Sequence, residues 1–191
     1  HIIRLEEKTL LGYPWNKLYD LSYLREKQLQ YEDMALNEDI FFNIAFVHDI
    51  DSLNILNIVP YHYQKKIDYG LTSKFVADYY DLHMLRISKM LELYKSWELC
   101  TEEVKQILAN IYVRYITSAI QRNCDKRSGM SRKEQKKFIK DLFDTYLYHE
   151  LIEHVSTESK IVKKLSAFLQ NKNVNACYMS GKGIYFVKNK L

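Results

Sequence analysis

The chain has little glycine and proline, with 5 Gly and 2 Pro among 191 residues. Because these residues mark turns and interrupt helices, their scarcity predicts long helices joined by few tight turns. Cysteine is also scarce, and Cys100, Cys124 and Cys177 lie far apart without a C-x-x-C pair. This spacing argues against a disulfide framework or a cysteine zinc site, and it predicts three buried or free thiols in a reducing cytoplasm.

Long apolar runs and a strong charge of one sign are missing as well. The longest candidate run, residues 40–59, is interrupted by His48, Asp49 and Asp51, whereas a membrane-spanning helix needs about 18 or more apolar residues. The net charge is only +4, from 28 basic and 24 acidic residues, which is not the clustered basic footprint of a nucleic-acid-binding protein. We therefore expect neither a transmembrane segment nor a nucleic-acid partner.

The apolar pattern divides the chain near Gly70. Residues 1–70 are mixed, with an apolar helix expected over 40–47 and a strand over 53–63, which is rich in Ile, Val and Tyr. Residues 71–191 follow the helical period of about 3.6 residues and predict a helical C-terminal domain. The expected fold is mainly α with a small β contribution.

Four helices are expected in this second part, and two of them have clear start signals. The hydroxyl of Thr101 can cap one helix, and Ser131 with Glu134 forms a capping box at the start of another. Ser156 or Thr157 can cap the last. The expected helices cover residues 75–97, 102–122, 132 to about 154, and 157 to about 171.

The tail, residues 173–191, contains Ser180-Gly181-Lys182-Gly183. This segment lacks the upstream glycine of a G-x-x-x-x-G-K phosphate loop, and no Ser or Thr follows its lysine. It is therefore predicted to be a turn. Residues 184–187 would follow as a strand or a short amphipathic helix.

Most familiar catalytic signatures are missing. His149 and His154 are five positions apart rather than the four of a helical zinc pair, and no G-x-S-x-G or cysteine-centred motif occurs. An acidic pair, Glu38 and Asp39, stands just before an apolar segment. Such a pair is usually a helix start, where carboxylates are favoured by exposed amides, but it can also supply a base.

Three motifs in the first third fall in a recognisable order. Trp15-Asn16-Lys17-Leu18-Tyr19 is followed by Asn37-Glu38-Asp39 with Phe42 three residues on, and then by Val59-Pro60-Tyr61-His62-Tyr63. This order resembles the second half of family 2 glycosyltransferases of the GT-A fold, whose members typically build bacterial capsular, exopolysaccharide or wall polymers. The resemblance covers residues 13–73. It implies the C-terminal part of a GT-A α/β fold, followed by a helical bundle.

The resemblance also implies roles for the acidic pair and for the first motif. Asp39 would be the general base that takes the proton from the acceptor hydroxyl in an inverting displacement, and Glu38 would orient the acceptor or the base. Trp15 would stack on a sugar ring, although a core aromatic is an equally good interpretation. Asn16 and Lys17 would hydrogen-bond the acceptor or the donor phosphate.

The third motif would complete the substrate side. Tyr61 and Tyr63 would line the site, and Lys65 and Lys66 would stand where the family usually has arginine near the donor diphosphate. Lysine supplies a point charge there but no bidentate fork. His62 is a candidate metal ligand. The complete enzyme would use Mg²⁺ or Mn²⁺, a nucleotide-sugar donor, and a saccharide or lipid-linked acceptor.

The resemblance lacks its first half, because no nucleotide-binding strand and no Asp-x-Asp motif precedes these residues. The expectation is a C-terminal portion of a longer enzyme that is inactive by itself and binds no metal tightly. The alternative is a non-catalytic module that docks a partner or its own oligomer through residues 75–171. The Lys-rich end, residues 160–190, adds the hypothesis of peripheral contact with the inner face of a membrane.

Overall fold

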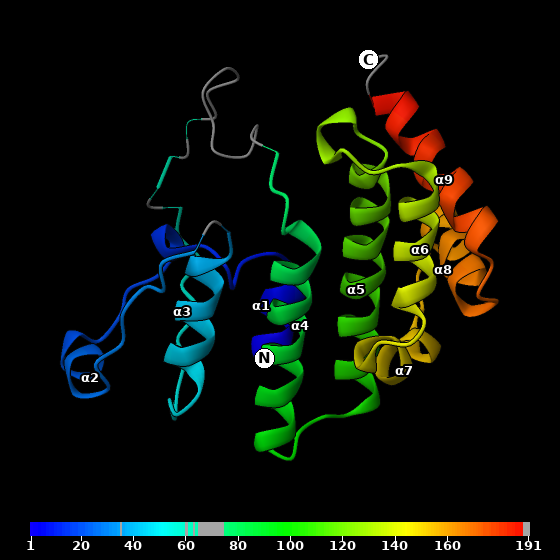
Figure 1. The fold of residues 1–191 in the computed structure, drawn as a ribbon. Helices are drawn as coiled ribbons and strands as arrows, with labels where there is room; N and C mark the ends of the chain where they lie inside the picture. Colours follow the sequence, from blue (N-terminus) through cyan, green and yellow to red (C-terminus); the bar gives the residue numbers. More distant parts are fainter. Residues whose placement is uncertain (35, 60, 63, 65–74, 189–191) are drawn as a thin grey trace. The chain divides into compact units, whose positions relative to one another are not determined.

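The computed structural model describes residues 1–191 except 35, 60, 63, 65–74 and 189–191. It divides into two compact units, His1–Val76 and Ala77–Leu191. Helices are the regular elements described in both units, and the described residues contain no strand (Figure 1). The expectation of a mainly α protein is confirmed. The predicted boundary at Gly70 falls outside the described residues.

The first unit, which we call unit 1, is built around one apolar helix. α3 (Glu38–Val47) buries Ile40, Phe41 and Ile44 in its core. Asp20 caps α2 by accepting hydrogen bonds from the amides of Ser22 and Tyr23. The elements of unit 1 are α1 (Ile2–Glu7), the 3-10 helix η1 (Pro14–Asn16), α2 (Leu21–Glu26) and α3.

The predicted strand over residues 53–63 is wrong for every residue that the structure describes there. Residues 53–59, 61 and 62 have no regular structure, and Ile55 and Val59 are 71% and 83% exposed. β-Branched residues favour a strand only when a neighbouring strand accepts their backbone hydrogen bonds. The described part of the chain offers no such neighbour, so composition alone was misleading.

The second unit, unit 2, packs its helices around α5 (Glu102–Asn123), whose buried residues include Tyr112 and Ile116. α5 contacts α4, α6, α7, α8 and α9, and Figure 1 shows it running through this unit. The remaining elements are α4 (Tyr79–Ser96), η3 (Lys126–Ser128), α6 (Arg132–Leu142), α7 (Tyr146–Leu151), η4 (Ile152–His154), α8 (Lys160–Gln170) and α9 (Val174–Lys188).

Helix starts agree with the sequence where a cap is unambiguous. The Thr101 hydroxyl accepts from the amide of Val104, and both hydrogen bonds of the Ser131–Glu134 capping box are present. The predicted helix from 132 to 154 is wrong in its second half, because Thr145 caps a new helix, α7. The last cap is Ser159, rather than Ser156 or Thr157.

The predicted turn at residues 180–183 is also wrong, since this segment lies within α9. Gly181 is buried where α9 crosses α5. A Cβ atom at Gly181 would collide with Ile120 Cγ2 and stand 3.2 Å from the backbone of Ile120. The glycine is needed for close helix packing, and the same helix continues through residues 184–187.

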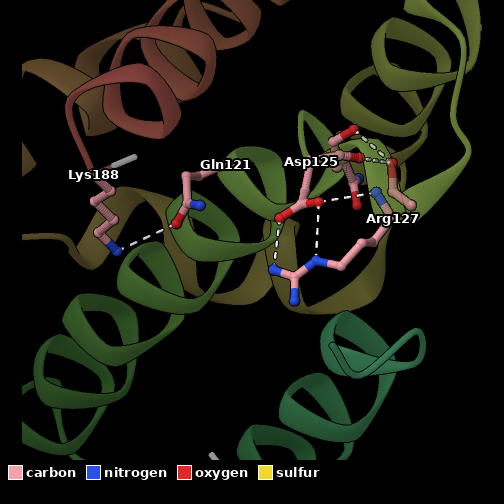
Figure 2. Close-up of polar contacts among 6 residues, drawn as sticks. Gln121, Asp125, Arg127 and Lys188 are labelled. Carbon is pink, nitrogen blue, oxygen red and sulfur yellow. Dashed lines mark hydrogen bonds and ion pairs between the residues drawn. The ribbon is translucent and has the colours of Figure 1, made fainter. Parts of the chain in front are cut away.

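A side-chain hydrogen bond joins the C-terminal ends of α5 and α9. Figure 2 shows Lys188 Nζ donating to Gln121 Oε1, a distance of 3.2 Å, and Arg127 forming a bidentate pair with Asp125.

Within the described ranges, every helix is too short or too polar to traverse a bilayer. The three cysteines are free thiols, with Cys177 buried.

Candidate functional site

The ammonium group of Lys17 holds the loop around the first motif. Its Nζ donates to the carbonyl oxygens of Leu10 and Tyr13 over 2.7 Å each, and to Asn16 Oδ1 over 2.8 Å. Asn16 Nδ2 donates to the same Leu10 carbonyl over 3.0 Å. Since an ammonium group has three protons, all three have protein acceptors. Asn16 and Lys17 therefore shape residues 10–17 in this structure.

That loop presents Trp15 in an aromatic row. Trp15 lies in η1 and stacks on Tyr13, with ring centroids 4.5 Å apart, and on Tyr61, at 6.0 Å. Trp15 is half-buried, whereas Tyr13 and Tyr61 are exposed. Two residues predicted to bind substrate, Trp15 and Tyr61, are thus brought together from distant parts of unit 1.

The acidic pair occupies the first turn of α3. Asn37 occupies the N-cap position with a left-handed backbone (φ 72°) and no side-chain capping hydrogen bond, and Glu38 and Asp39 follow. Burial raises the pKa of Asp39, and the neighbouring Glu38 carboxylate raises it further, whereas Lys17 acts in the opposite direction. A carboxylate with a raised pKa is a stronger base, which suits proton abstraction from a hydroxyl.

Lys17 and Asp39 are electrostatic neighbours. Burial lowers the pKa of Lys17 to about 8, and the charges of Asp39 and Glu6 oppose that shift. Glu6 is itself buried, on α1. The loop that carries Trp15 therefore brings a cation close to the predicted base.

Asn43 connects this loop to the acidic helix start. Its side chain is 1% exposed. Asn43 Nδ2 donates to the carbonyl oxygens of Asp39 over 2.8 Å and Gly12 over 3.4 Å, and Oδ1 accepts from the Tyr19 hydroxyl over 2.7 Å. Sequence reasoning missed Asn43. The available signal was an amide one helical turn after Asp39, inside an otherwise apolar run.

Two tyrosines that sequence reasoning also missed pack on the same helix. Tyr31 stacks on Phe42 at 4.4 Å, and Tyr19 meets Phe42 edge-on at 5.5 Å. Burial raises the pKa of both phenols, and the negative charge of Asp39 contributes in each case. Both hydroxyls therefore remain protonated donors at neutral pH. We call Lys17, Tyr19, Tyr31, Asp39 and Asn43 the Asp39 cluster.

The remaining predicted site residues are less organised. His62 is exposed, and among the described residues no three His, Cys, Asp or Glu side chains come together as a metal site would require. The structure therefore gives no support to His62 as a metal ligand. Tyr63, Lys65 and Lys66 lie outside the described residues.

Comparisons with protein-family models, with curated proteins and with solved structures find no match to this chain. The resemblance to family 2 glycosyltransferases therefore depends on the three sequence motifs alone.

Proposed function

We propose that this chain is the acceptor-side portion of an inverting glycosyltransferase similar to family 2, with Asp39 as the general base. The observation that carries the proposal is the position of Asp39. It is half-buried in the first turn of α3, its pKa is raised, and Lys17, with which it interacts electrostatically, is on the loop that presents Trp15.

In the proposed reaction, an acceptor hydroxyl attacks the anomeric carbon of a nucleotide sugar. The new C–O bond forms as the bond to the nucleotide diphosphate breaks, and the hydroxyl proton passes to an Asp39 carboxylate oxygen. A divalent cation on the diphosphate would stabilise the leaving charge. Glu38 keeps the pKa of Asp39 high, and Trp15 with Tyr61 offers apolar ring faces for a sugar.

The proposal assigns Asn16 and Lys17 a different role from the one the resemblance implies. Their polar atoms already bond to residues 10–16. They would position Trp15 and tune Asp39, rather than contact phosphate. Donor binding is left to other parts of the enzyme, a view supported by the exposed apolar segment 53–59, which suits burial against further protein.

The test uses the enzyme that contains this chain, with radiolabelled nucleotide sugars and isolated acceptor glycans. Asp39→Asn keeps the size of the side chain and removes the base, so transfer should fall by about a thousandfold or more, while donor binding by calorimetry stays within about twofold. Asp33→Asn, at an exposed position in the same unit, is the matched control. Wild-type transfer by the Asp39→Asn enzyme would rule out the base assignment.

A second candidate function is a helical interaction or oligomerisation module. It is favoured by the compactness of unit 2, which forms a separate packed body of helices. Sedimentation equilibrium of the whole chain over a hundredfold range of concentration tests self-association. A concentration-independent monomer that retains no partner would contradict this candidate and leave the glycosyltransferase proposal intact.

A further inference from the structure

α9 has an outer face that carries large apolar side chains. Met179, Phe186 and Val187 are 60%, 58% and 58% exposed. Positions three, four and seven apart share one face of a helix, so Lys182 and Gly183 lie with Met179 and Phe186. The opposite side of α9 holds its buried residues, Cys177, Tyr178 and Gly181. We call Met179, Lys182, Gly183, Phe186 and Val187 the α9 outer face.

Two basic helices pack against α9. α9 contacts both α6 and α8, and the three helices together carry ten Lys and Arg residues but only two acidic residues, Glu134 and Asp141. The guanidinium carbon of Arg132 and Nζ of Lys136 lie 5.7 and 5.6 Å from the ring centroid of Tyr178. Positive charge on α6 therefore directly adjoins α9.

Among the residues that the structure describes, few ion pairs cancel this charge. Lys137 pairs with Asp141, and Lys136 donates to the neutral Asn175 amide oxygen. At the end of α9, Lys188 donates to the neutral Gln121, whereas nearby Arg127 pairs with Asp125 (Figure 2). The helices around the α9 outer face thus keep an excess of positive charge.

We propose that the α9 outer face docks on the surface of an anionic lipid bilayer. Lipid headgroups offer the negative charge that the lysines and arginines attract, and the acyl boundary accepts Met179, Phe186 and Val187. The combination of exposed apolar side chains with surrounding positive charge fits a bilayer better than it fits a second copy of this chain or a nucleic acid.

A second copy of this chain would bring like charges together. A two-fold contact pairs a surface with itself, so the positive charge at and beside the α9 outer face would meet the same charge on the second copy. A nucleic acid would match the charge but offers no apolar partner for Met179 or Val187. A bilayer offers both an apolar region for the exposed side chains and negative headgroups for the lysines and arginines.

The depth of binding follows from the packing of α9. Because Gly181 sits directly against Ile120 of α5, the helix keeps its buried side in unit 2, and only the tips of the outer side chains enter the lipid. Such shallow contact is reversible and weakens as salt screens the headgroups.

The experiment is co-sedimentation of the whole chain with extruded vesicles. One set contains phosphatidylcholine alone, and the other contains phosphatidylcholine with one part in three of phosphatidylglycerol. The chain should pellet with the anionic vesicles at low salt, and about tenfold less of it should pellet with neutral vesicles or in high salt.

Two variants and two matched controls locate the contact. Arg132→Gln with Lys182→Gln should weaken binding about tenfold, whereas Lys8→Gln with Arg114→Gln removes one lysine and one arginine elsewhere and should have no effect. Phe186→Ser should weaken binding about fivefold, and Leu18→Ser, at a position 93% exposed in unit 1, should not.

Three outcomes would overturn the proposal. They are a chain that stays in the supernatant with anionic vesicles at low salt, equal losses in the variants and their controls, and a dimer in sedimentation equilibrium that Phe186→Ser abolishes. None of these outcomes depends on sugar transfer, so the proposal stands or falls separately from the glycosyltransferase assignment.

Discussion

The two units differ in where they place polar side chains and charge. Unit 1 has 8 Lys and Arg against 11 Asp and Glu, a net charge of −3, whereas unit 2 has 20 against 13, a net charge of +7. Unit 1 gathers buried polar groups, including Asn43 and Glu6, around loops and a helix start. Unit 2 mostly fills the space between helices with apolar residues. Under the proposed function, chemistry is assigned to unit 1, whereas unit 2 contributes packing and the α9 outer face.

The largest expected effect on stability is at the contact of α5 with α9. Gly181→Ala adds a methyl group that collides with Ile120, and overpacking should destabilise unit 2 by about 3 kcal/mol. Gly183→Ala is the control, because nothing lies within 4 Å of that added Cβ, and it should be neutral or slightly stabilising. Hydrogen exchange should rise in unit 2 alone. Equal loss of protection in unit 1 would show that the two units are not independent.

Asn43→Leu tests the buried hydrogen bonds that connect α3 to the loop in unit 1. The variant keeps the number and branching of the side-chain non-hydrogen atoms but removes three hydrogen bonds, leaving the Tyr19 hydroxyl without its acceptor, so unit 1 should lose about 2 kcal/mol. Exchange protection should fall in α3 and not in α5. Asn54→Leu, at an exposed position, should leave protection unchanged. A stable Asn43→Leu protein would mean that the Asn43 hydrogen bonds are not needed to hold the loop.

Acid should weaken unit 2 through His83. Its ring lies against Tyr115, with centroids 3.8 Å apart, and burial, reinforced by Arg86 and Arg122, lowers its pKa to about 3. The unfolded chain binds a proton near pH 6.5, but the folded chain does not. Stability from the neutral ring is therefore present above pH 6.5 and lost as the pH falls from 6.5 towards 3.

The expected slope in that range is at most about 1.4 kcal/mol per pH unit. Urea titrations at pH 7, 6, 5 and 4 measure it. His83→Phe keeps a buried aromatic ring but removes the titrating group, so it should flatten the slope, whereas His149→Phe, at an exposed position, should keep it. Parallel slopes in wild type and His83→Phe would remove His83 as the cause.

The smallest expected effect concerns the pH dependence of transfer. The carboxylate of Glu38 helps to raise the pKa of Asp39, so Glu38→Gln should lower that pKa. The acidic limb of the kcat/KM profile should then move to lower pH, with little change in the plateau. Glu26→Gln, on α2, is the control. If the acidic limb of the kcat/KM profile does not move, the limb reflects the titration of a group other than Asp39.

Local signals in the sequence predicted two of the helix starts in unit 2 correctly. Thr101 and the Ser131–Glu134 box stand where the structure has helix starts, because a cap depends only on residues within one turn. The structure at Gly181 was predicted wrongly because it depends on Ile120, which is distant in the sequence. The structure at residues 53–59 was predicted wrongly because a strand needs a neighbouring strand, and the described residues contain none. Gly181 looks like a turn residue until Ile120 is placed beside it.

In the candidate site, too, residues in sequence motifs were predicted, whereas a residue that depends on distant partners was missed. Trp15, Lys17 and Asp39 were selected from the order of motifs, and the structure puts them in one unit. Asn43 was missed because its importance comes from Gly12 and Tyr19, residues 31 and 24 positions away. The role assigned to Lys17 also changed from binding phosphate to holding the loop. The spacing of residues in the sequence does not reveal hydrogen-bond partners such as the Leu10 carbonyl.

The close approach of α9 to α5 restricts how this sequence can evolve. Every substitution at position 181 adds at least a methyl group that collides with Ile120 Cγ2 and also stands 3.2 Å from the Ile120 backbone. A change of Ile120 to a side chain without Cγ2 removes the collision but not the backbone contact, so position 181 stays restricted to glycine while α9 keeps this approach to α5. Positions 179, 182 and 186 on the other side of the same helix carry no such constraint, and they are free to drift or to be selected for what they touch.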